Sequence, residues 1–423
     1  MTASLLTDAP GRCMKCGFCM SNCPVYGIDP IESHVARGRN MLILQKQAGT
    51  LPPGKAYVQS LSHCLLCGRC RAVCPAKVSS PEITVAARAA VVRQQGVSWS
   101  QALVFRGILK HRHLMAHLAG IAARLPGLGS KQGTPLRHMA DMTAVVSAGI
   151  AIPRLSRPFL ADRLKSIRKP PDPSATRGRV VFFAGCGFEF FFSGMGQAMV
   201  EILTRSGFEV VYPQSQGCCG IAAYNAGDVK TARKMASANL SAFTDCDAIV
   251  TGCATCGTAL KHYGHWLPQG NGLRAAAESL AGKVWDFSHF VHHHGFPGQP
   301  RRKRPLKVTY HDPCHLRWHQ GIIEPPRRLL AGLQDIDYVE MDGADACCGL
   351  AGSFAITHQE TSRAIQAKKM AAIARTKADV VVTSCPGCIV QLMDGAQRHH
   401  VPVKVMHIGQ MLNKFEAGAN HGE

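Results

Sequence analysis

The sequence predicts an α/β protein that carries a smaller helical domain at its N-terminus. Two observations predict this fold class. From about residue 179 the chain repeats once, at an offset of 128–132 residues, and each copy alternates short apolar strands with helices. The first hundred residues instead hold two compact cysteine motifs with a helical stretch, residues 33–47, between them. We therefore expect a helical domain over residues 1–100, a basic linker with helices over 101–178, and tandem α/β repeats over 179–300 and 301–423.

The composition is that of a folded protein with an unusual number of thiols. Hydrophobic residues make up 46% of the 423 residues and charged residues 18%, which excludes intrinsic disorder. The 19 cysteines do not indicate a disulfide scaffold, because such chains are normally short and secreted. The first ten residues lack the basic segment and apolar run of a signal peptide, so we expect a cytoplasmic protein. In that compartment thiols more often bind metal than pair with each other.

The positive charge of the chain is unevenly distributed. The net charge is +21, and residues 101–180 hold 14 Lys and Arg against three Asp and no Glu. A basic segment first suggests nucleic acid, but the aromatic content is only 6% and the segment carries no nucleic-acid-binding motif, so we expect no nucleic-acid partner. Part of the charge could offset metal-bound thiolates, and the rest could attract an acidic partner or an anionic membrane surface.

No segment is predicted to span a membrane. A spanning helix needs about 20 apolar residues, whereas the longest charge-free run of the basic segment, residues 142–153, has 12. Residues 102–127 mix apolar and basic side chains at nearly helical spacing. They predict a helix that packs on the protein with a solvated basic face. The alternative is a helix that docks on a membrane surface or on a partner.

Two cysteine motifs with the same spacing occupy residues 13–24 and 64–75. Both have the form C-x2-C-x2-C-x3-C-P, which is typical of a pair of [4Fe–4S] clusters. Three close cysteines hold one cubane cluster, while the fourth, turned away by the longer step and the proline, reaches the other cluster. Zinc also binds C-x2-C pairs, but a zinc site does not need the remaining cysteines and prolines. One predicted cluster takes Cys13, Cys16, Cys19 and Cys74, and the other takes Cys64, Cys67, Cys70 and Cys23.

The two repeats have the same order of elements. In the first copy we expect strands at residues 180–184, 209–212 and 248–251, and helices at 195–206 and 228–243. In the second copy we expect strands at 306–310, 337–341 and 379–383, and a helix at 359–377. The copies close with the related segments 284–289 and 403–408. Strands and helices that alternate over short connections predict α/β layers with parallel strands.

Each repeat places five cysteines near the ends of its strands. In open α/β sheets ligands bind at the carboxyl ends of the strands, so we expect the five thiols to converge there. Adjacent cysteines suit a multinuclear metal cluster better than a disulfide, and the glycine after each pair allows close backbone approach. The alternatives are buried structural cysteines or zinc. The two sets are Cys186, Cys218, Cys219, Cys253 and Cys256, and Cys314, Cys347, Cys348, Cys385 and Cys388.

On these motifs the chain resembles a known superfamily. The N-terminal motifs are similar to the helical type of dicluster ferredoxin domain, and the repeats resemble the cysteine-rich CCG domain. CCG domains occur in pairs in the heterodisulfide reductase catalytic subunit. They also occur in the iron–sulfur subunits of glycolate oxidase, anaerobic glycerol-3-phosphate dehydrogenase and lactate-utilisation systems. The order of the motifs, and the segment CCGLAGSFAITH at 347–358, most resemble the glycolate oxidase iron–sulfur subunit family.

The resemblance implies particular cofactors and partners. A CCG repeat can hold a non-cubane [4Fe–4S] cluster with its five cysteines, so we expect one or two of these beside the two cubane clusters, and Cys246 is left as an inert thiol. The chain carries no flavin-binding signature, which implies that an FAD-containing dehydrogenase subunit oxidises the substrate. The chain would pass electrons from a glycolate- or lactate-type 2-hydroxy acid to a quinone or another redox carrier. We expect this electron transfer to take place in the cytoplasm, with the inner face of the cell membrane as one location for the protein.

Other functions stay open from the sequence. The CCG clusters could themselves reduce a disulfide or a quinone, as in heterodisulfide reductase, or the chain could be a zinc-binding module on nucleic acid. No residue stands out as catalytic. His311 and His315 flank Cys314 and could donate to cluster sulfur or relay protons, although a structural role fits at least as well. Gly194 and Gly196 suggest a dinucleotide fingerprint, but its third glycine is missing.

Overall fold

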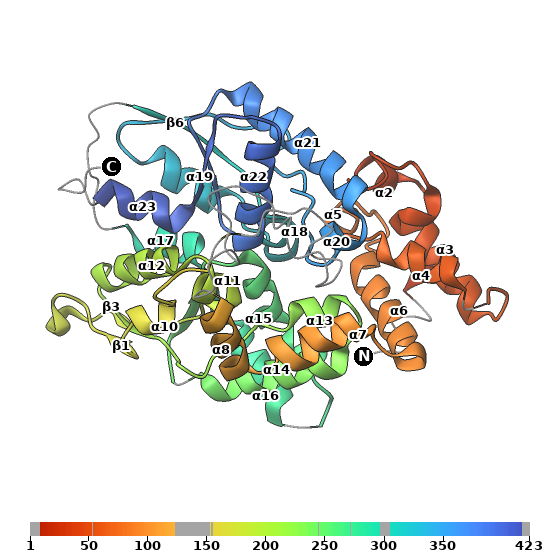
Figure 1. Cartoon of the computed structure of the whole chain (residues 1–423), viewed down its shortest axis with the longest axis horizontal. Coiled ribbons are helices and arrows are strands. Elements are labelled where there is room, and N and C mark those ends of the chain that lie inside the picture. Colours follow the sequence, from red (N-terminus) through yellow and green to blue (C-terminus); the bar gives the residue numbers. More distant parts are fainter. Residues whose placement is uncertain are drawn as a thin grey trace.

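A helical N-terminal part precedes two α/β repeats that pack on each other (Figure 1). The computed structural model describes residues 9–52, 54–122, 153, 155–243, 245–270, 272–296 and 305–416. The helices before the repeats are η1 (Pro10–Arg12), α2 (Phe18–Ser21), η2 (Glu32–His34), α3 (Ala36–Gln47), α4 (Lys55–Ser62), α5 (Arg69–Ala72), α6 (Ser80–Gln95), α7 (Trp99–Ala102), the π-helix η3 (Leu103–Leu109) and α8 (Arg112–Ala122).

The first repeat is built on a five-stranded sheet of order β1-β3-β2-β4-β5. Its neighbouring strands are parallel except for the edge pair β1–β3, and Val180 of β2 lies opposite Val210 and Ala248. The strands are β1 (Ile167–Arg168), β2 (Gly178–Phe182), β3 (Phe208–Val211), β4 (Ala248–Thr251) and β5 (Val284–Asp286). The helices are α10 (Leu160–Arg163), η4 (Pro173–Ala175), α11 (Gly185–Phe190), α12 (Ser193–Arg205), α13 (Ile221–Asn225), α14 (Val229–Ala242), α15 (Ala254–Trp266), α16 (Gly272–Ala281) and α17 (Phe287–His294).

The second repeat has a four-stranded parallel sheet of order β7-β6-β8-β9. Its strand order matches that of the first sheet without the edge strand β1, as expected of a duplicated unit. The strands are β6 (Leu306–Tyr310), β7 (Ile336–Tyr338), β8 (Val380–Thr383) and β9 (Lys404–His407). The helices are α18 (Cys314–Gln320), α19 (Glu324–Ala331), α20 (Phe354–Thr357), α21 (Gln359–Thr376), α22 (Pro386–Arg398) and α23 (Ile408–Glu416).

The predicted α/β layers with parallel strands are confirmed, and most predicted strands agree closely. The strands at 248–251 and 306–310 have the predicted bounds. The strand predicted at 180–184 ends at Phe182, because the chain turns there into α11. The predicted helix at 102–127 is divided into η3 and α8, and residues 123–127 lie outside the described residues. The domain boundaries themselves stay predictions.

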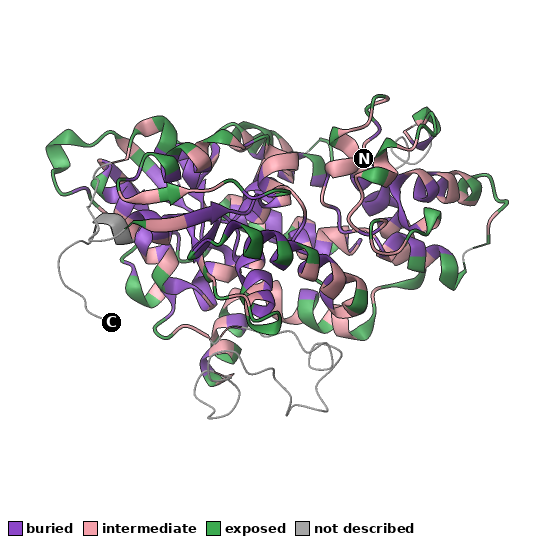
Figure 2. Ribbon diagram, turned by 90° about the horizontal axis from the view of Figure 1, so that it is seen from above, coloured by how far each residue is buried: buried purple, intermediate pink, exposed green. Residues whose placement is uncertain are grey.

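One apolar core joins the two sheets. It includes Phe182 and Val250 of the first sheet and Val308 and Val382 of the second, all of them completely buried. Both central strands β4 and β8 are buried along their whole length, as strands covered by helices on both faces usually are. In Figure 2 the buried residues gather along the strands in the middle of the repeats.

The N-terminal part has a much smaller core of its own. Side chains from α3, α4 and α6 form it, among them Ile43, Leu61 and Ile83. So small a core supplies little stabilisation by apolar burial alone, and domains of this size usually depend on metals or other cross-links. None of the helices within the described ranges is both long and apolar enough to cross a membrane.

Arg88 of α6 fastens the N-terminal part to the first repeat. Its guanidinium donates to the carbonyls of Leu61 (2.7 Å) and Cys64 (2.9 Å) on one side and to that of Asn225 (2.8 Å) in α13 on the other. Gly227 leaves the room for this approach, since an added Cβ there would lie 2.7 Å from the backbone of Arg88. The loop with the second N-terminal motif is thereby held against the first repeat.

Candidate metal centres

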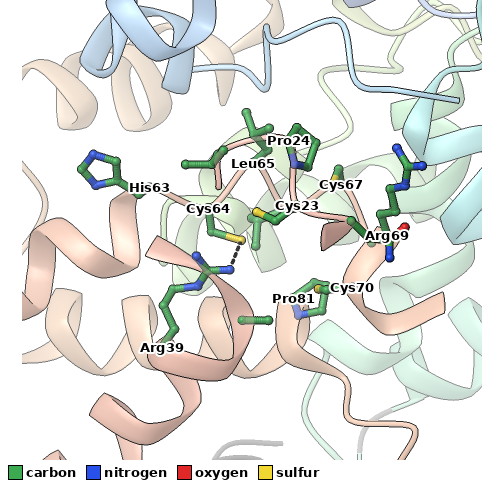
Figure 3. Close-up of a pocket in the computed structure, with 15 residues that line it drawn as sticks. Cys23, Pro24, Arg39, His63, Cys64, Leu65, Cys67, Arg69, Cys70 and Pro81 are labelled. Atoms are coloured by element: carbon green, nitrogen blue, oxygen red, sulfur yellow. Dashed lines mark hydrogen bonds between the residues drawn. The ribbon is translucent and has the colours of Figure 1, made fainter. Parts of the chain in front are cut away.

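The second N-terminal motif and Cys23 line one cavity. Cys64 and Cys67 lie in the loop between α4 and α5, Cys70 lies in α5, and Cys23 follows α2. Figure 3 shows these four side chains around the same cavity. Gly68 makes the loop possible, because its φ of +83° is one that other residues rarely adopt. This inner N-terminal set, Cys64, Cys67, Cys70 and Cys23, is the combination that the motif spacing predicts.

A buried arginine accompanies the inner N-terminal set. Arg39 of α3 is 2% exposed, and its Nη2 donates to the sulfur of Cys64 at 3.2 Å. Burial alone would lower the pKa of Arg39, but the surrounding thiols, led by Cys64 and Cys23, raise it above its usual value. The guanidinium is therefore a permanent cation beside four potential thiolates. Sequence analysis missed Arg39, because nothing in the helix pattern marks it as buried.

The first N-terminal motif forms a more open site. Cys16 is exposed, while Cys13 and Cys74 pack against the same small core of α3, α4 and α6. Cys19 lies close enough to Cys13 and Cys23 for their charges to raise the pKa of its thiol, although burial raises it more. The outer N-terminal set, Cys13, Cys16, Cys19 and Cys74, thus combines three residues of one motif with the last cysteine of the other.

The five cysteines of the first repeat converge at the carboxyl edge of its sheet. Contact runs from Cys186 to Cys218, from Cys219 to Cys256, and from Cys256 to Cys253. Gly185 provides the room for this approach, because an added Cβ would lie 2.9 Å from the sulfur of Cys256. We call these five residues the first repeat set, and their role as metal ligands stays a prediction: Cys186, Cys218, Cys219, Cys253 and Cys256.

The second repeat brings its five cysteines together in the same way. Cys314 contacts Cys347, and the sulfurs of Cys348 and Cys388 are 3.6 Å apart. Cys388 in turn contacts Cys385. The second repeat set is Cys314, Cys347, Cys348, Cys385 and Cys388, and all 19 cysteines of the chain are free thiols rather than disulfides.

The four thiol sets form a continuous series. Cys253 and Cys385 are in direct contact, which joins the two repeat sets. Cys67 of the inner N-terminal set faces Cys314 and Cys347, whose charges add to burial in raising the pKa of its thiol. The order is therefore outer N-terminal set, inner N-terminal set, second repeat set and first repeat set. The sequence did not predict that the second repeat lies nearest the N-terminal part.

The residues around these sets fit iron–sulfur clusters. His311 is completely buried, and neither of its ring nitrogens has a hydrogen-bond partner among the described residues. A ring nitrogen of His311 lies within 4.8 Å of the sulfurs of Cys348 and Cys388. The carbonyl of Ala344 lies beside the ring and accepts the backbone N–H of Asp312 at 3.1 Å. An unpaired buried imidazole is costly, and sulfur of a bound cluster would supply its partner. Sets of four or five thiolates without oxygen ligands are likewise typical of iron–sulfur clusters.

The remaining sequence candidates lie outside these sets. Gly196 allows close packing of α12, since an added Cβ would lie 2.6 Å from the side chain of Leu160, so close helix packing accounts for this glycine. Cys246 precedes β4 and lies at the opposite edge of the sheet from the first repeat set. His315 is half-buried and stacks on His319 with ring centroids 4.6 Å apart.

Comparison with known proteins agrees with this arrangement. Residues 10–78 match the 4Fe-4S dicluster domain, and residues 180–261 and 308–393 match the cysteine-rich domain called CCG. The chain is 32% identical over 425 residues to the "Probable glycolate oxidase iron-sulfur subunit" of Bacillus subtilis. The aligned residues cover 95% of this chain and 93% of that protein. The chain belongs to the glycolate oxidase iron–sulfur subunit family. The matched domains indicate that members of this kind carry iron–sulfur clusters.

Two further relatives widen the family. "Lactate utilization protein A" of Geobacillus thermodenitrificans is 32% identical over 235 residues, which cover 56% of this chain and 98% of that protein. One of the subunits of a CoM/CoB fumarate reductase from Methanothermobacter marburgensis is 26% identical over 411 residues, which cover 95% of this chain and 71% of that protein. The relatives thus include subunits named for a glycolate oxidase and a fumarate reductase, and a protein named for lactate utilization.

Proposed function

We propose that this chain is the electron-transfer subunit of a flavin-dependent 2-hydroxy-acid dehydrogenase complex of the glycolate or lactate type. The observation that carries the proposal is the continuous series of four thiol sets, from the outer N-terminal set to the first repeat set. A chain of redox centres needs neighbouring sites with little intervening protein. The closeness of Cys67 to Cys314 and the contact of Cys253 with Cys385 supply this. The names of the relatives support the substrate class.

The ligands proposed are the eighteen cysteines of the four sets. The two N-terminal sets would each hold a cubane [4Fe–4S] cluster, and each repeat set would hold a non-cubane [4Fe–4S] cluster. Iron–sulfur clusters exchange single electrons, whereas oxidation of a hydroxy acid by hydride transfer needs a flavin. We therefore place substrate oxidation in an FAD-containing partner and assign to this chain the transfer of electrons to a quinone or another carrier.

Two buried cations of the chain lie beside these cysteine sets. Arg39 holds a permanent cation beside the inner N-terminal set. Lys369 of α21 is buried near the second repeat set, where its Nζ donates to the carbonyls of Gly343 (2.7 Å) and Ala344 (3.2 Å). Burial lowers the pKa of Lys369 to about 8, so it stays largely protonated at neutral pH. Both cations would offset the negative charge of clusters ligated by thiolates.

Peripheral contact with the inner face of the cell membrane belongs to the same proposal. The η3–α8 segment exposes Leu103, Leu114, Leu118 and Ile121, and the basic residues Arg106 and Lys110 lie in the same segment. Exposed apolar and basic side chains together favour an anionic lipid surface. Sedimentation of the chain with vesicles that contain anionic lipid would support this contact, and no greater sedimentation than with neutral vesicles would refute it.

A second function is favoured by the contact between the repeat sets. Cys253 and Cys385 meet directly, so two clusters there would be adjacent and could act together on a disulfide. The relative from Methanothermobacter marburgensis carries the name of a CoM/CoB fumarate reductase, which fits such a role. Steady turnover of an organic disulfide by the isolated, chemically reduced chain would favour this function over electron relay alone.

The deciding experiment is anaerobic purification of the chain from its own cells. We expect a flavoprotein to co-purify and the complex to reduce an artificial dye with glycolate or lactate. Iron and sulfide contents should correspond to more than the eight iron atoms of two cubane clusters. A preparation with neither flavoprotein nor hydroxy-acid-dependent dye reduction would contradict the proposed complex. One that contained zinc in place of iron and sulfide would contradict the redox role altogether.

A further inference from the structure

A cavity of about 320 Å³ lies where the N-terminal part meets both repeats. Ligand pockets of proteins typically have volumes of roughly 300–1,000 Å³. Leu66 and Val85 line the cavity from the N-terminal part, Tyr224 and Trp266 from the first repeat, and His315 from α18 of the second. We propose that this cavity binds the ring of a quinone and is the site where the electrons leave the chain.

The apolar wall of the cavity fits a flat ring. Tyr224 and Trp266 stack on each other with centroids 4.3 Å apart and planes 13° from parallel. Leu66, Val85 and Ile221 add aliphatic surface. Aromatic rings prefer stacked or edge-to-face neighbours, and such pairs contribute beyond simple apolar burial. A planar, uncharged ring therefore has a complementary surface here.

Among the polar groups that line the cavity are imidazoles placed to serve ring carbonyls. His315 Nδ1 is buried and has no hydrogen-bond partner among the described residues, so a ligand carbonyl could accept its proton in a hydrogen bond. His319 is fixed by donation from Nε2 to the carbonyl of Leu66 at 3.0 Å. His262 is fixed by donation from Nδ1 to the carbonyl of Thr258 at 2.7 Å, which leaves its Nε2 available. An unpartnered buried polar atom that lines a cavity indicates a ligand rather than a packed core.

The charge of the lining argues against an anionic ligand. Among the described residues that line the cavity, Arg71 is the one permanent cation, and it is already paired with Glu82 and with the carbonyl of Trp318 (2.9 Å). A nucleotide, a flavin phosphate or an anionic thiol coenzyme would need unpaired cations or helix N-termini for its charge. A neutral quinone needs only hydrogen bonds at its two carbonyls.

The position of the cavity connects it to two proposed clusters. Leu66 stands between Cys64 and Cys67 of the inner N-terminal set, and His315 follows Cys314 of the second repeat set. A ligand in the cavity would therefore border both sets. Reduction of a quinone takes two electrons and two protons and converts both carbonyl oxygens to hydroxyls. The electrons would come one at a time from the clusters, which the flavoprotein reduces. The inference rests on the proposed function only for this origin of the electrons.

The protons can be supplied by a pair of histidines. His265 is exposed, His262 is half-buried at the cavity wall, and their ring centroids are 5.8 Å apart. Protons from solvent would reach the cavity through His265 and His262 as the ring oxygens are reduced. Because His262 keeps Nδ1 on a carbonyl, its Nε2 is the atom that delivers the proton.

Binding of a quinone can be tested directly on the full chain, purified without oxygen. The probe is menadione, a naphthoquinone without a lipid tail, and the measurement is calorimetric titration. Two variants alter the cavity: Val85→Trp fills it, and His262→Gln removes the proposed proton donor but keeps an amide. His292→Gln, on the exposed end of α17, is the matched control. We expect one saturable site, at least tenfold weaker binding in both cavity variants, and unchanged binding in the control.

Electron paramagnetic resonance spectra of the reduced chains show whether each variant keeps its clusters. If Val85→Trp loses its clusters, His262→Gln carries the test by itself. Binding that is absent in the wild type, or unaffected by the cavity variants, would overturn the quinone site. Failure of the two proposals is distinguishable. Hydroxy-acid-dependent dye reduction by the complex without menadione binding overturns the cavity alone, whereas menadione binding without dye reduction overturns the proposed complex alone.

Discussion

At the scale of single residues, the two repeat sets differ in one buried neighbour. His311 stands three residues before Cys314, and the corresponding position before Cys186 is Phe183. Both side chains are completely buried. An imidazole can donate a hydrogen bond to cluster sulfur, and a phenyl ring cannot. Two clusters with otherwise equal ligands would therefore differ in reduction potential.

Replacing His311→Phe should lower the potential of the cluster in the second repeat set. A hydrogen bond to sulfur stabilises the more negative, reduced state, so its loss favours the oxidised state. If the bond contributes about 1.4 kcal/mol, the shift is about 60 mV for one electron. Redox titration followed by electron paramagnetic resonance measures it. His399→Phe, exposed at the end of α22, is the control, and equal shifts in both variants would show that His311 does not donate to the cluster.

Arg39 has a corresponding role at the inner N-terminal set. Arg39→Met keeps most of the apolar stem but removes the cation beside Cys64, and leaves a negatively charged site without its nearest buried partner. We expect a lower reduction potential for one cluster and faster loss of iron to a chelator, by about tenfold or more. Arg93→Met, exposed on α6, should change neither quantity. If both variants release iron at the wild-type rate, Arg39 contributes only packing.

At the scale of elements, the strands could be predicted from short apolar runs in the sequence. The short helices could not, because tertiary contacts determine where they form. β4 and β8 are runs of four buried residues, and such runs are readily predicted. α11 and α18 are too short for a helical period to appear in the sequence. They begin within two residues of Cys186 and Cys314, and they turn each first cysteine toward the adjacent pair. The convergence of five thiols thus depends on turns that have no periodic signal.

The element α6 supplies a test of how the N-terminal part is held. Arg88→Ala would leave the carbonyls of Leu61, Cys64 and Asn225 without a buried donor. Each unpaired buried carbonyl costs roughly 1–3 kcal/mol, so a loss of about 3 kcal/mol of unfolding free energy is expected. Thermal unfolding of the anaerobic protein measures it, and Arg88→Lys should lose less because one donor remains. A variant as stable as the wild type would show that water replaces these bonds.

At the scale of the whole molecule, stability is divided unequally. The repeats share one extended core, whereas the N-terminal part depends on a small core around Ile43, Leu61 and Ile83. Metal ligation would therefore contribute a larger share of the folding free energy in the N-terminal part. The same inequality predicts which region unfolds first when iron is lost.

Removal of iron by an anaerobic chelator should loosen the N-terminal part first. We expect faster amide hydrogen exchange over residues 9–95 by at least tenfold, while β4 and β8 remain protected. Hydrogen exchange with mass spectrometry measures both regions in one sample. Adding iron and sulfide back should restore protection. Equal loss of protection in both regions would mean that the repeats depend on their clusters as much as the N-terminal part does.

The family and the fold class could be predicted correctly from the sequence alone, because ligand spacing and strand pattern are local properties of the chain. The grouping of the cysteines into ligand sets was predicted from the same spacing. The sequence could not show that Arg39 and His311 would be buried beside sulfur, since burial depends on what packs against a residue from elsewhere. Nor could it show that Cys67 faces Cys314, or that Leu66, His262 and His315 border one cavity. Those neighbours are 53 to 249 residues apart in sequence, and only the packing of α6, α15 and α18 brings them together.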